Sequence, residues 1–130
     1  MNTLELTYQH ALLAALNAPG RATRVFRQNV GTVVKRDRRG RQVGVFHAGP
    51  PKGAADLSGI VAPDGTRLEV EVKSATAPWT PEQKRWRAFI VARGGVHVIV
   101  RFDEERSMDE NVADAVGAID AAIAARRAAA

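Results

Sequence analysis

Three stretches of the chain carry apolar residues at the three- and four-residue spacing of an amphipathic helix. The first covers residues 4–16, preceded by Thr3 as a candidate N-cap and followed by an Asn-Ala-Pro-Gly stop. The second begins at Pro81, with Thr80 as N-cap, and stops at a Gly-Gly pair. The third is an Ala-rich helix over residues 108–127. Its apolar stripe consists of Val112, Val116, Ile119 and Ile123.

Between the first and third helices, alternating or continuous apolar runs are typical of β-strands. Turn residues separate them: the basic run 35–41 around Gly40 predicts a hairpin tip, and Pro-Asp-Gly at 63–65 predicts a tight turn. The element order α-β-β-β-β-α-β-α therefore predicts an α+β domain around one mixed sheet. The expected strands are residues 24–34, 42–47, 55–61, 67–73 and 96–102.

Length and composition favour one ordinary domain over residues 1–130, since domains usually have about 100–150 residues. The hydrophobic fraction of 45% and the charged fraction of 25% argue against disorder and coiled coil. The sequence has no cysteine, which excludes a disulfide framework, a zinc ribbon and a thiol nucleophile. Because it also lacks a signal-peptide core and an apolar run of about 20 residues, we expect a soluble intracellular protein.

Charge is unevenly distributed along the chain, whose formal net charge is +5. Residues 1–52 contain nine Lys and Arg against two Asp and Glu, whereas residues 53–130 contain ten against twelve. A basic half favours a polyanion partner, and a half that holds most carboxylates favours a cation site. The alternative is that the basic residues only keep a small protein in solution.

The segment Leu-Glu-Val-Glu-Val-Lys at 68–73 carries the candidate chemistry. Because side chains alternate along a strand, Glu69, Glu71 and Lys73 share the face opposite the apolar residues. The tight turn that follows the preceding strand folds Asp56 back beside Glu71. The sequence therefore predicts one cluster of two carboxylates and an ammonium group.

Hard cations such as Mg²⁺ prefer carboxylate oxygens and keep several waters. A cation held by Asp56 and Glu71 could polarise a phosphate and lower the pKa of a bound water, while Lys73 orients that water or stabilises developing charge. The alternative is a solvated strand face with cross-strand ion pairs worth a few tenths of a kcal/mol. Both interpretations are compatible with the strand pattern.

Five short motifs follow one another along the chain. They are Arg27-Gln28-Asn29-Val30-Gly31, Gly53-Ala54-Ala55-Asp56-Leu57, Glu71-Val72-Lys73, Thr80-Pro81-Glu82-Gln83 with Trp86, and Gly94-Gly95. In this order they resemble the VRR-NUC nuclease family of the PD-(D/E)XK superfamily. The resemblance covers about residues 24–101, and one departure is Ala55, where the family usually has proline before the aspartate.

The resemblance implies a restriction-endonuclease-like core, a mixed sheet flanked by helices, and a nuclease that uses Mg²⁺ or Mn²⁺. By position, Asp56 and Glu71 would bind the metal, the backbone carbonyl of Val72 would complete its shell, and Lys73 would be the catalytic lysine. Gln83 would lie near the active site and position Lys73 or a phosphate.

The family's first helix often supplies another carboxylate, for which Glu5 is the acidic candidate, with Gln9 and His10 as alternatives. None of the three histidines, His47 and His97 included, has metal-ligand spacing, so we expect them to be structural or exposed. Basic residues of the first expected strand, of the hairpin tip that follows it and of the loop at residue 52 would hold the phosphate backbone. The candidates are Arg24, Arg27, Lys35, Arg36, Arg38, Arg39, Arg41 and Lys52.

Standalone proteins of this size in the family resemble phage or bacterial enzymes that act on branched DNA, so the resemblance implies a homodimer in a bacterial or phage-infected cytoplasm. Two alternatives stay open at this point. One is a nucleic-acid-binding module of the same fold without catalysis, and the other is an RNA-directed or restriction-type nuclease.

Overall fold

The computed structural model describes residues 3–28 and 31–129, without the side chains of residues 31–33, 47 and 48. The observed order, α-β-β-β-β-β-α-β-α, contains one strand more than the sequence pattern predicts. No described helix is both long and apolar enough to cross a bilayer. The elements are α1 (Thr3–Leu16), β1 (Thr23–Arg27), β2 (Gly31–Arg36), β3 (Gln42–Ala48), β4 (Leu57–Val61), β5 (Thr66–Ser74), α2 (Pro81–Ala92), β6 (Val96–Phe102) and α3 (Met108–Ala128).

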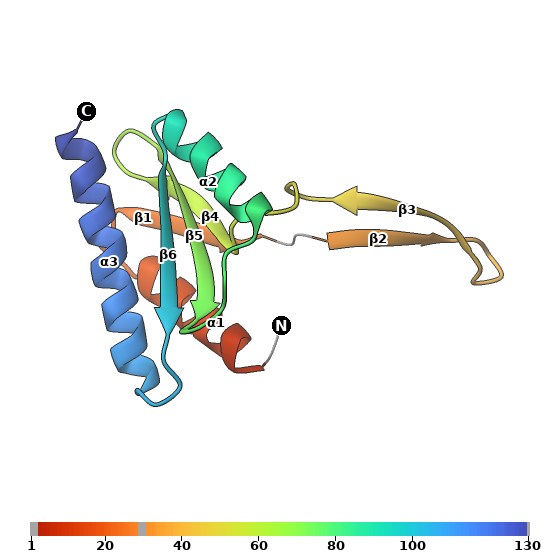
Figure 1. Cartoon of the computed structure of the whole chain (residues 1–130), viewed down its shortest axis with the longest axis horizontal. Helices are drawn as coiled ribbons and strands as arrows, with labels where there is room; N and C mark the ends of the chain where they lie inside the picture. The colour runs from red at the N-terminus through yellow and green to blue at the C-terminus, as the bar shows by residue number, and fades with distance from the viewer. Residues whose placement is uncertain (1–2, 29–30, 130) are drawn as a thin grey trace.

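Four strands form the main sheet in the order β1-β4-β5-β6. The first three pair antiparallel and β5 pairs parallel with β6, so the sheet is mixed, as predicted. Helices α1 and α3 contact each other and cover one face, while α2 lies on the other (Figure 1). The predicted α+β class, a mixed sheet flanked by helices, is confirmed at this level.

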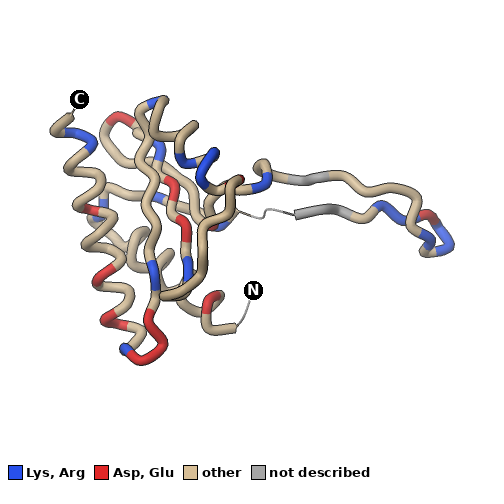
Figure 2. The backbone as a smooth tube through the Cα atoms, in the orientation of Figure 1, with Lys and Arg blue, Asp and Glu red and all other residues tan. Residues whose placement is uncertain are grey.

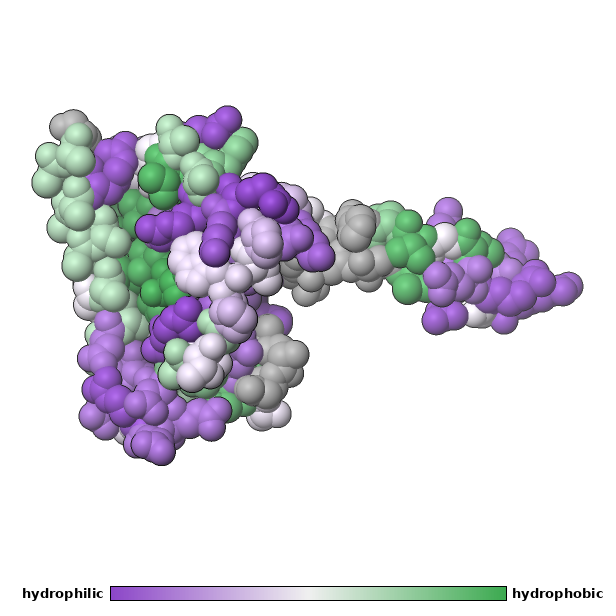
Figure 3. Space-filling model, viewed as in Figure 1, coloured by the Kyte–Doolittle hydropathy of each residue, from purple (hydrophilic) through white to green (hydrophobic). Residues whose placement is uncertain are grey.

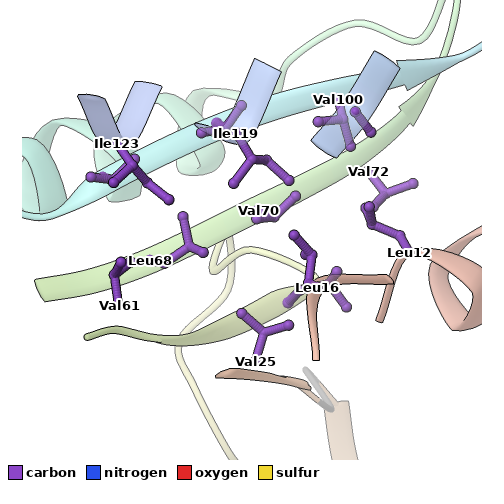
Figure 4. Packing of buried hydrophobic residues seen from close by; sticks show 14 of the residues in the cluster. Leu12, Leu16, Val25, Val61, Leu68, Val70, Val72, Val100, Ile119 and Ile123 are labelled. Carbon is purple, nitrogen blue, oxygen red and sulfur yellow. The ribbon is translucent and has the colours of Figure 1, made fainter. Parts of the chain in front are cut away.

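The hydrophobic core lies between the sheet and the α1–α3 pair (Figure 4). Leu68, Val70 and Val72 of β5 are at most 2% exposed and point into the same layer as Leu16 and Ile119. Each such burial stabilises the fold by about 1.5–3 kcal/mol. The apolar half of β5 is thereby fixed on the core side, and strand alternation turns its polar half toward α2.

The expected strand over residues 24–34 is wrong in its length. It divides into β1, which ends at Arg27, and β2, which begins at Gly31; Asn29 and Val30 of the family-like motif lie outside the described residues. The physical reason is the length of the neighbouring strand. Residue 27 pairs with Leu57, the first residue of β4, so the chain beyond it has no β4 strand beside it.

Residues 31–48 instead form a separate two-stranded ribbon, β2 paired with β3, which we call the arm. The arm projects from the rest of the molecule, which we call the body (Figure 1). The predicted hairpin tip is confirmed: one Asp37 carboxylate oxygen accepts the backbone N–H groups of Arg39 and Arg41 at 2.9 and 3.0 Å. The expectation that this hairpin belongs to the single mixed sheet is wrong.

Helix ends follow the predicted capping chemistry with one exception. Thr80 and Gln83 form a reciprocal capping box at the start of α2. Thr3, expected as an N-cap, is already helical. On α3, Ile119 and Ile123 are buried as predicted, but Val112 and Val116 are only partly buried.

Candidate active site

The polar row of β5 lies beneath α2. Glu69, Glu71 and Lys73 are 0%, 5% and 8% exposed, respectively. They share one face, as the alternation predicts, but the solvated strand face considered from the sequence is wrong, because α2 covers it. Buried charges are costly unless they are paired, hydrogen-bonded or bound to a metal. Each of these three groups therefore requires a partner.

Asp56 stands directly before β4, at the point where the β4–β5 ladder ends. Leu57 pairs with Val70, and beyond this pair an Asp56 carboxylate oxygen accepts the backbone N–H of Val72 at 2.8 Å. A strand residue directs its N–H and C=O to the same side, so the carbonyl of Val72 also faces Asp56. The end of β4 thus leaves room for the Asp56 side chain and the backbone of Val72 to converge.

Glu71 lies in the same place and is incompletely satisfied. Its Oε1 accepts the Gln83 side-chain amide at 3.1 Å, while its Oε2 is buried without a hydrogen-bond partner among the described residues. Burial, and after it the Asp56 carboxylate, raises the pKa of Glu71 to about 9, although the Lys73 ammonium acts in the opposite direction. The site therefore disfavours two negative charges unless a cation joins them.

This donor set suits a hard divalent cation that retains water. Two carboxylates and the Val72 carbonyl are oxygen ligands of the kind Mg²⁺ prefers, and the orphan oxygen of Glu71 is available to it. Within residues 3–28 and 31–129, no group of three or more His, Asp or Glu side chains is arranged to hold a metal. The charge of Glu5 adds to the rise in the pKa of Glu71, after burial and Asp56.

Lys73 and Gln83 complete the cluster. The Lys73 ammonium donates to the carbonyl of Pro78 at 3.0 Å, which leaves two of its three N–H donors for other groups. The Gln83 side chain accepts from the backbone N–H of Thr80 at 3.0 Å while donating to Glu71. Gln83 thus fixes a carboxylate, whereas the resemblance implied a contact with Lys73 or a phosphate.

A second layer of contacts, which the sequence did not reveal, supports the cluster. Trp86 donates its indole N–H to Glu69 at 2.7 Å, so it packs against the sheet. Gln28 donates its backbone N–H to the carbonyl of Asp56 at 2.8 Å and its side-chain amide to that of Ala55 at 3.0 Å. The only sequence signal for Gln28 was its place in the family-like motif.

The candidate phosphate-binding residues fall into two groups. Arg24 and Lys52 are exposed on the body, and Arg27 donates to the Gln9 side chain at 3.3 Å. The remaining candidates lie at the tip of the arm, far from the carboxylate cluster (Figure 2). They are Lys35, Arg36, Arg38, Arg39 and Arg41.

Neither of the two histidines whose side chains the structure describes joins the cluster. His10 is exposed, and the His47 side chain lies outside the described residues. His97 is buried beside the Arg87 guanidinium, which donates to its backbone carbonyl at 2.7 Å. Burial, and then Arg87, lowers the pKa of His97 to about 4, so it stays neutral near pH 7. Its environment is that of a structural histidine.

No protein-family model matches the chain, and no curated protein matches it. The function must therefore be argued from the geometry of the cluster and from the residues that carry the family resemblance.

Proposed function

We propose that the protein is a metal-dependent nuclease with a PD-(D/E)XK core of the VRR-NUC type, which hydrolyses phosphodiester bonds in DNA. The observation that carries the proposal is the buried Glu71 carboxylate. One of its oxygens has no partner in the described structure, Asp56 lies beside it, and Lys73 shares its strand face. A structural carboxylate pair would be a poor way to stabilise a sheet, because the two groups lose hydration on burial and the single Lys73 ammonium cannot balance both negative charges.

In this proposal Asp56, Glu71 and the Val72 carbonyl would hold Mg²⁺ or Mn²⁺, and Glu5 would be a further carboxylate candidate for the same metal. When bound, the metal supplies Lewis acidity to a phosphate oxygen and lowers the pKa of a bound water. Gln83 holds Glu71 in its ligand orientation. Lys73 directs its remaining N–H donors at the attacking water or at the charge that develops on the phosphate.

DNA is the proposed substrate because the first 52 residues are strongly basic. Arg24 and Lys52, both exposed on the body, would contact the phosphate backbone. The preference for branched DNA rests on the family resemblance alone. The expectation of a homodimer likewise rests on the family resemblance alone.

The test is cleavage of single-stranded, duplex, flap and four-way-junction DNA with Mg²⁺, with Mn²⁺ and with EDTA. We expect metal-dependent cutting by the wild type and none by Asp56→Ala. Asp64→Ala is the matched control, because Asp64 is an exposed aspartate in the turn that follows β4, whereas Asp56 directly precedes β4. Cutting that persists in Asp56→Ala or in EDTA would contradict the assignment. Metal-independent binding without cutting would identify a binding module, and cutting of RNA alone would replace the substrate.

A further inference from the structure

The arm leaves the body directly beside the carboxylate cluster. Gln28, three residues before β2 begins, donates its backbone N–H to the carbonyl of Asp56 at 2.8 Å. After the arm the chain passes through Gly53, where a Cβ would lie 2.5 Å from the Glu82 carbonyl group in α2, and reaches Asp56 three residues later. The root of the arm is therefore attached to the cluster on both sides.

The cluster is also most open to solvent at this root. Glu71 and Lys73 are buried under α2, whereas Asp56 is only half-buried. Lys52, in the loop that joins the arm to Asp56, is exposed. A phosphate that reaches the cluster therefore approaches on the Asp56 side, where the arm begins.

The tip of the arm carries positive charge that its single carboxylate cannot balance. Residues 35–41 contain five basic residues and one acidic residue, a net charge of +4. All five basic residues are exposed, and Figure 2 shows them at the far end of the arm. The acidic residue, Asp37, is already paired with Arg41 at 3.0 Å. The tip thus has the charge of a surface that contacts a polyanion.

Between the tip and the body, the arm exposes apolar side chains on both of its faces. Val45 and Phe46 are each 53% exposed, and as adjacent residues of β3 they point to opposite faces. Val34 and Val43 add to this exposed apolar surface (Figure 3). The major groove of duplex DNA admits a two-stranded β-ribbon and presents thymine methyl groups. It can therefore receive a ribbon that is apolar on both faces.

The length of the arm limits how far from the cluster its tip can act. The six residues of β2 extend about 20 Å at 3.4 Å per residue. Successive phosphates of one DNA strand are also about 3.4 Å apart along the duplex axis. The tip therefore reaches phosphates up to about six base pairs beyond the root of the arm, which lies beside the cluster.

We propose that the arm lies in the major groove of the duplex DNA that flanks the bond to be cut. Its basic tip contacts the phosphate backbone within about six base pairs of that bond. This inference rests on the proposed nuclease function, because the cluster determines where the bond lies. It adds a requirement for the substrate, which must be double-stranded on one side of the cut.

DNA binding in EDTA, measured by fluorescence anisotropy, tests the contact without cleavage. The probe is a fluorescein-labelled duplex of about two helical turns. Arg38→Gln/Arg39→Gln should raise the dissociation constant at least about tenfold. It should also make the plot of log affinity against log salt shallower by about two, since each lost phosphate contact removes about 0.9 from the slope.

The matched control is Arg93→Gln/Arg127→Gln, which removes the same charge from the body. These two arginines are exposed, at the end of α2 and in the last turn of α3. This control should bind the duplex as the wild type does. Equal binding by the tip variant and by this control overturns the proposal.

The position of the arm on DNA can be mapped because the chain has no cysteine, so one added thiol is labelled uniquely. Gln42→Cys, at an exposed position beside the tip, carries a benzophenone and is crosslinked in EDTA to four-way-junction DNA. Cuts made by the wild type with Mg²⁺ are mapped on the same DNA. We expect crosslinks in duplex, within about six base pairs of a cut and on one side of it. Ala128→Cys, exposed at the end of α3, should give none.

The two experiments separate the arm from the reaction. Crosslinks confined to single strands, or lying more than about one helical turn from every cut, overturn the proposed position of the arm. Cutting of DNA by a tip variant with unchanged affinity keeps the nuclease and rejects the arm contact. Tip-dependent binding of duplex without any cutting supports the arm contact and rejects the proposed reaction.

Discussion

At the scale of single residues, the cluster is defined by a carboxyl group placed where it cannot easily ionise. Glu71 is 5% exposed, has one oxygen without a partner among the described residues, and lies beside Asp56. Such a group stores free energy that a proton or a metal ion releases on binding. This state of Glu71 has one measurable consequence for the proton and another for the metal.

The first concerns the pH dependence of folding in EDTA. The unfolded carboxyl ionises near its ordinary pKa of 4.5, whereas the folded group keeps its proton up to about pH 9. The native state therefore binds more protons than the unfolded state in this window, and its free energy of unfolding falls as the pH rises from about 4.5 to about 9. Glu71→Gln should remove this slope, as measured by urea unfolding across the window. Parallel profiles for the variant and the wild type would contradict the raised pKa.

The second concerns Mg²⁺, which competes with the proton for Glu71. We expect Mg²⁺ to raise the melting temperature of the wild type, and to do so more strongly at pH 8 than at pH 6. The reason is that removing the proton from Glu71 costs less free energy at the higher pH. Asp56→Ala should lose the effect, and Asp64→Ala should keep it. An equal Mg²⁺ effect in both variants would place the metal elsewhere.

Lys73 is expected to act on the reaction and not on the binding of DNA. Lys73→Met preserves the buried aliphatic stem but removes the donor, so cleavage should fall by roughly 10²–10³-fold. DNA affinity should change little, as measured by fluorescence anisotropy with EDTA. The control is Lys84→Met on the exposed surface of α2. A loss of affinity that accounts for the whole loss of cleavage would make Lys73 a phosphate anchor only.

The grouping of Asp56, Glu71 and Lys73 can be predicted from the sequence, because strand alternation and one turn bring them to the same place. The contact of Gln83 with Glu71 cannot be predicted in this way. The capping pattern fixes the start of α2 but says nothing about the sheet beneath it. The complete burial of Glu69 has no local sequence signal either, since it depends on Trp86, which lies 17 residues later in α2.

At the scale of elements, one glycine sets the distance between α2 and the loop that leads to Asp56. Gly53 has a φ of +93°, and a Cβ there would lie 2.5 Å from the carbonyl group of Glu82 in the first turn of α2. The loop can approach the helix this closely only without a side chain. Gln83, the next residue of α2, is thereby held over Glu71.

Gly53→Ala should therefore destabilise the protein by more than the positive φ of residue 53 alone would cause. Gly65→Ala is the matched control, because Gly65 has a φ of +75° but a Cβ added there would meet nothing within 4 Å. We expect about 1 kcal/mol for Gly65→Ala and roughly 1–3 kcal/mol more for Gly53→Ala, measured by urea unfolding. Equal losses would show that the loop can move away from α2 without cost.

The division of the expected strand 24–34 into β1 and β2 depends on information that local sequence patterns do not contain. Residues 24–34 contain Val, Phe and Thr on both sides of the Arg-Gln-Asn run at 27–29, so the pattern predicts a single strand. Where a strand ends, however, depends on the length of the strand that pairs with it. β4 begins at Leu57, opposite Arg27, and no local signal near residue 27 contains that information.

At the scale of the whole molecule, the body and the arm carry separate properties. Every described member of the hydrophobic core, from Tyr8 to Ile123, lies in the body. The carboxylate cluster belongs to the body as well, since it joins the end of β4, the middle of β5 and the start of α2. The arm contributes exposed apolar side chains and most of the excess positive charge.

Replacing residues 31–48 by a short Gly-Ser linker should therefore leave the body folded. Because every described member of the core stays in place, the melting temperature in EDTA should stay within a few degrees of that of the wild type, and the Mg²⁺ effect at pH 8 should persist. A truncated chain that unfolds would show that the arm stabilises the body.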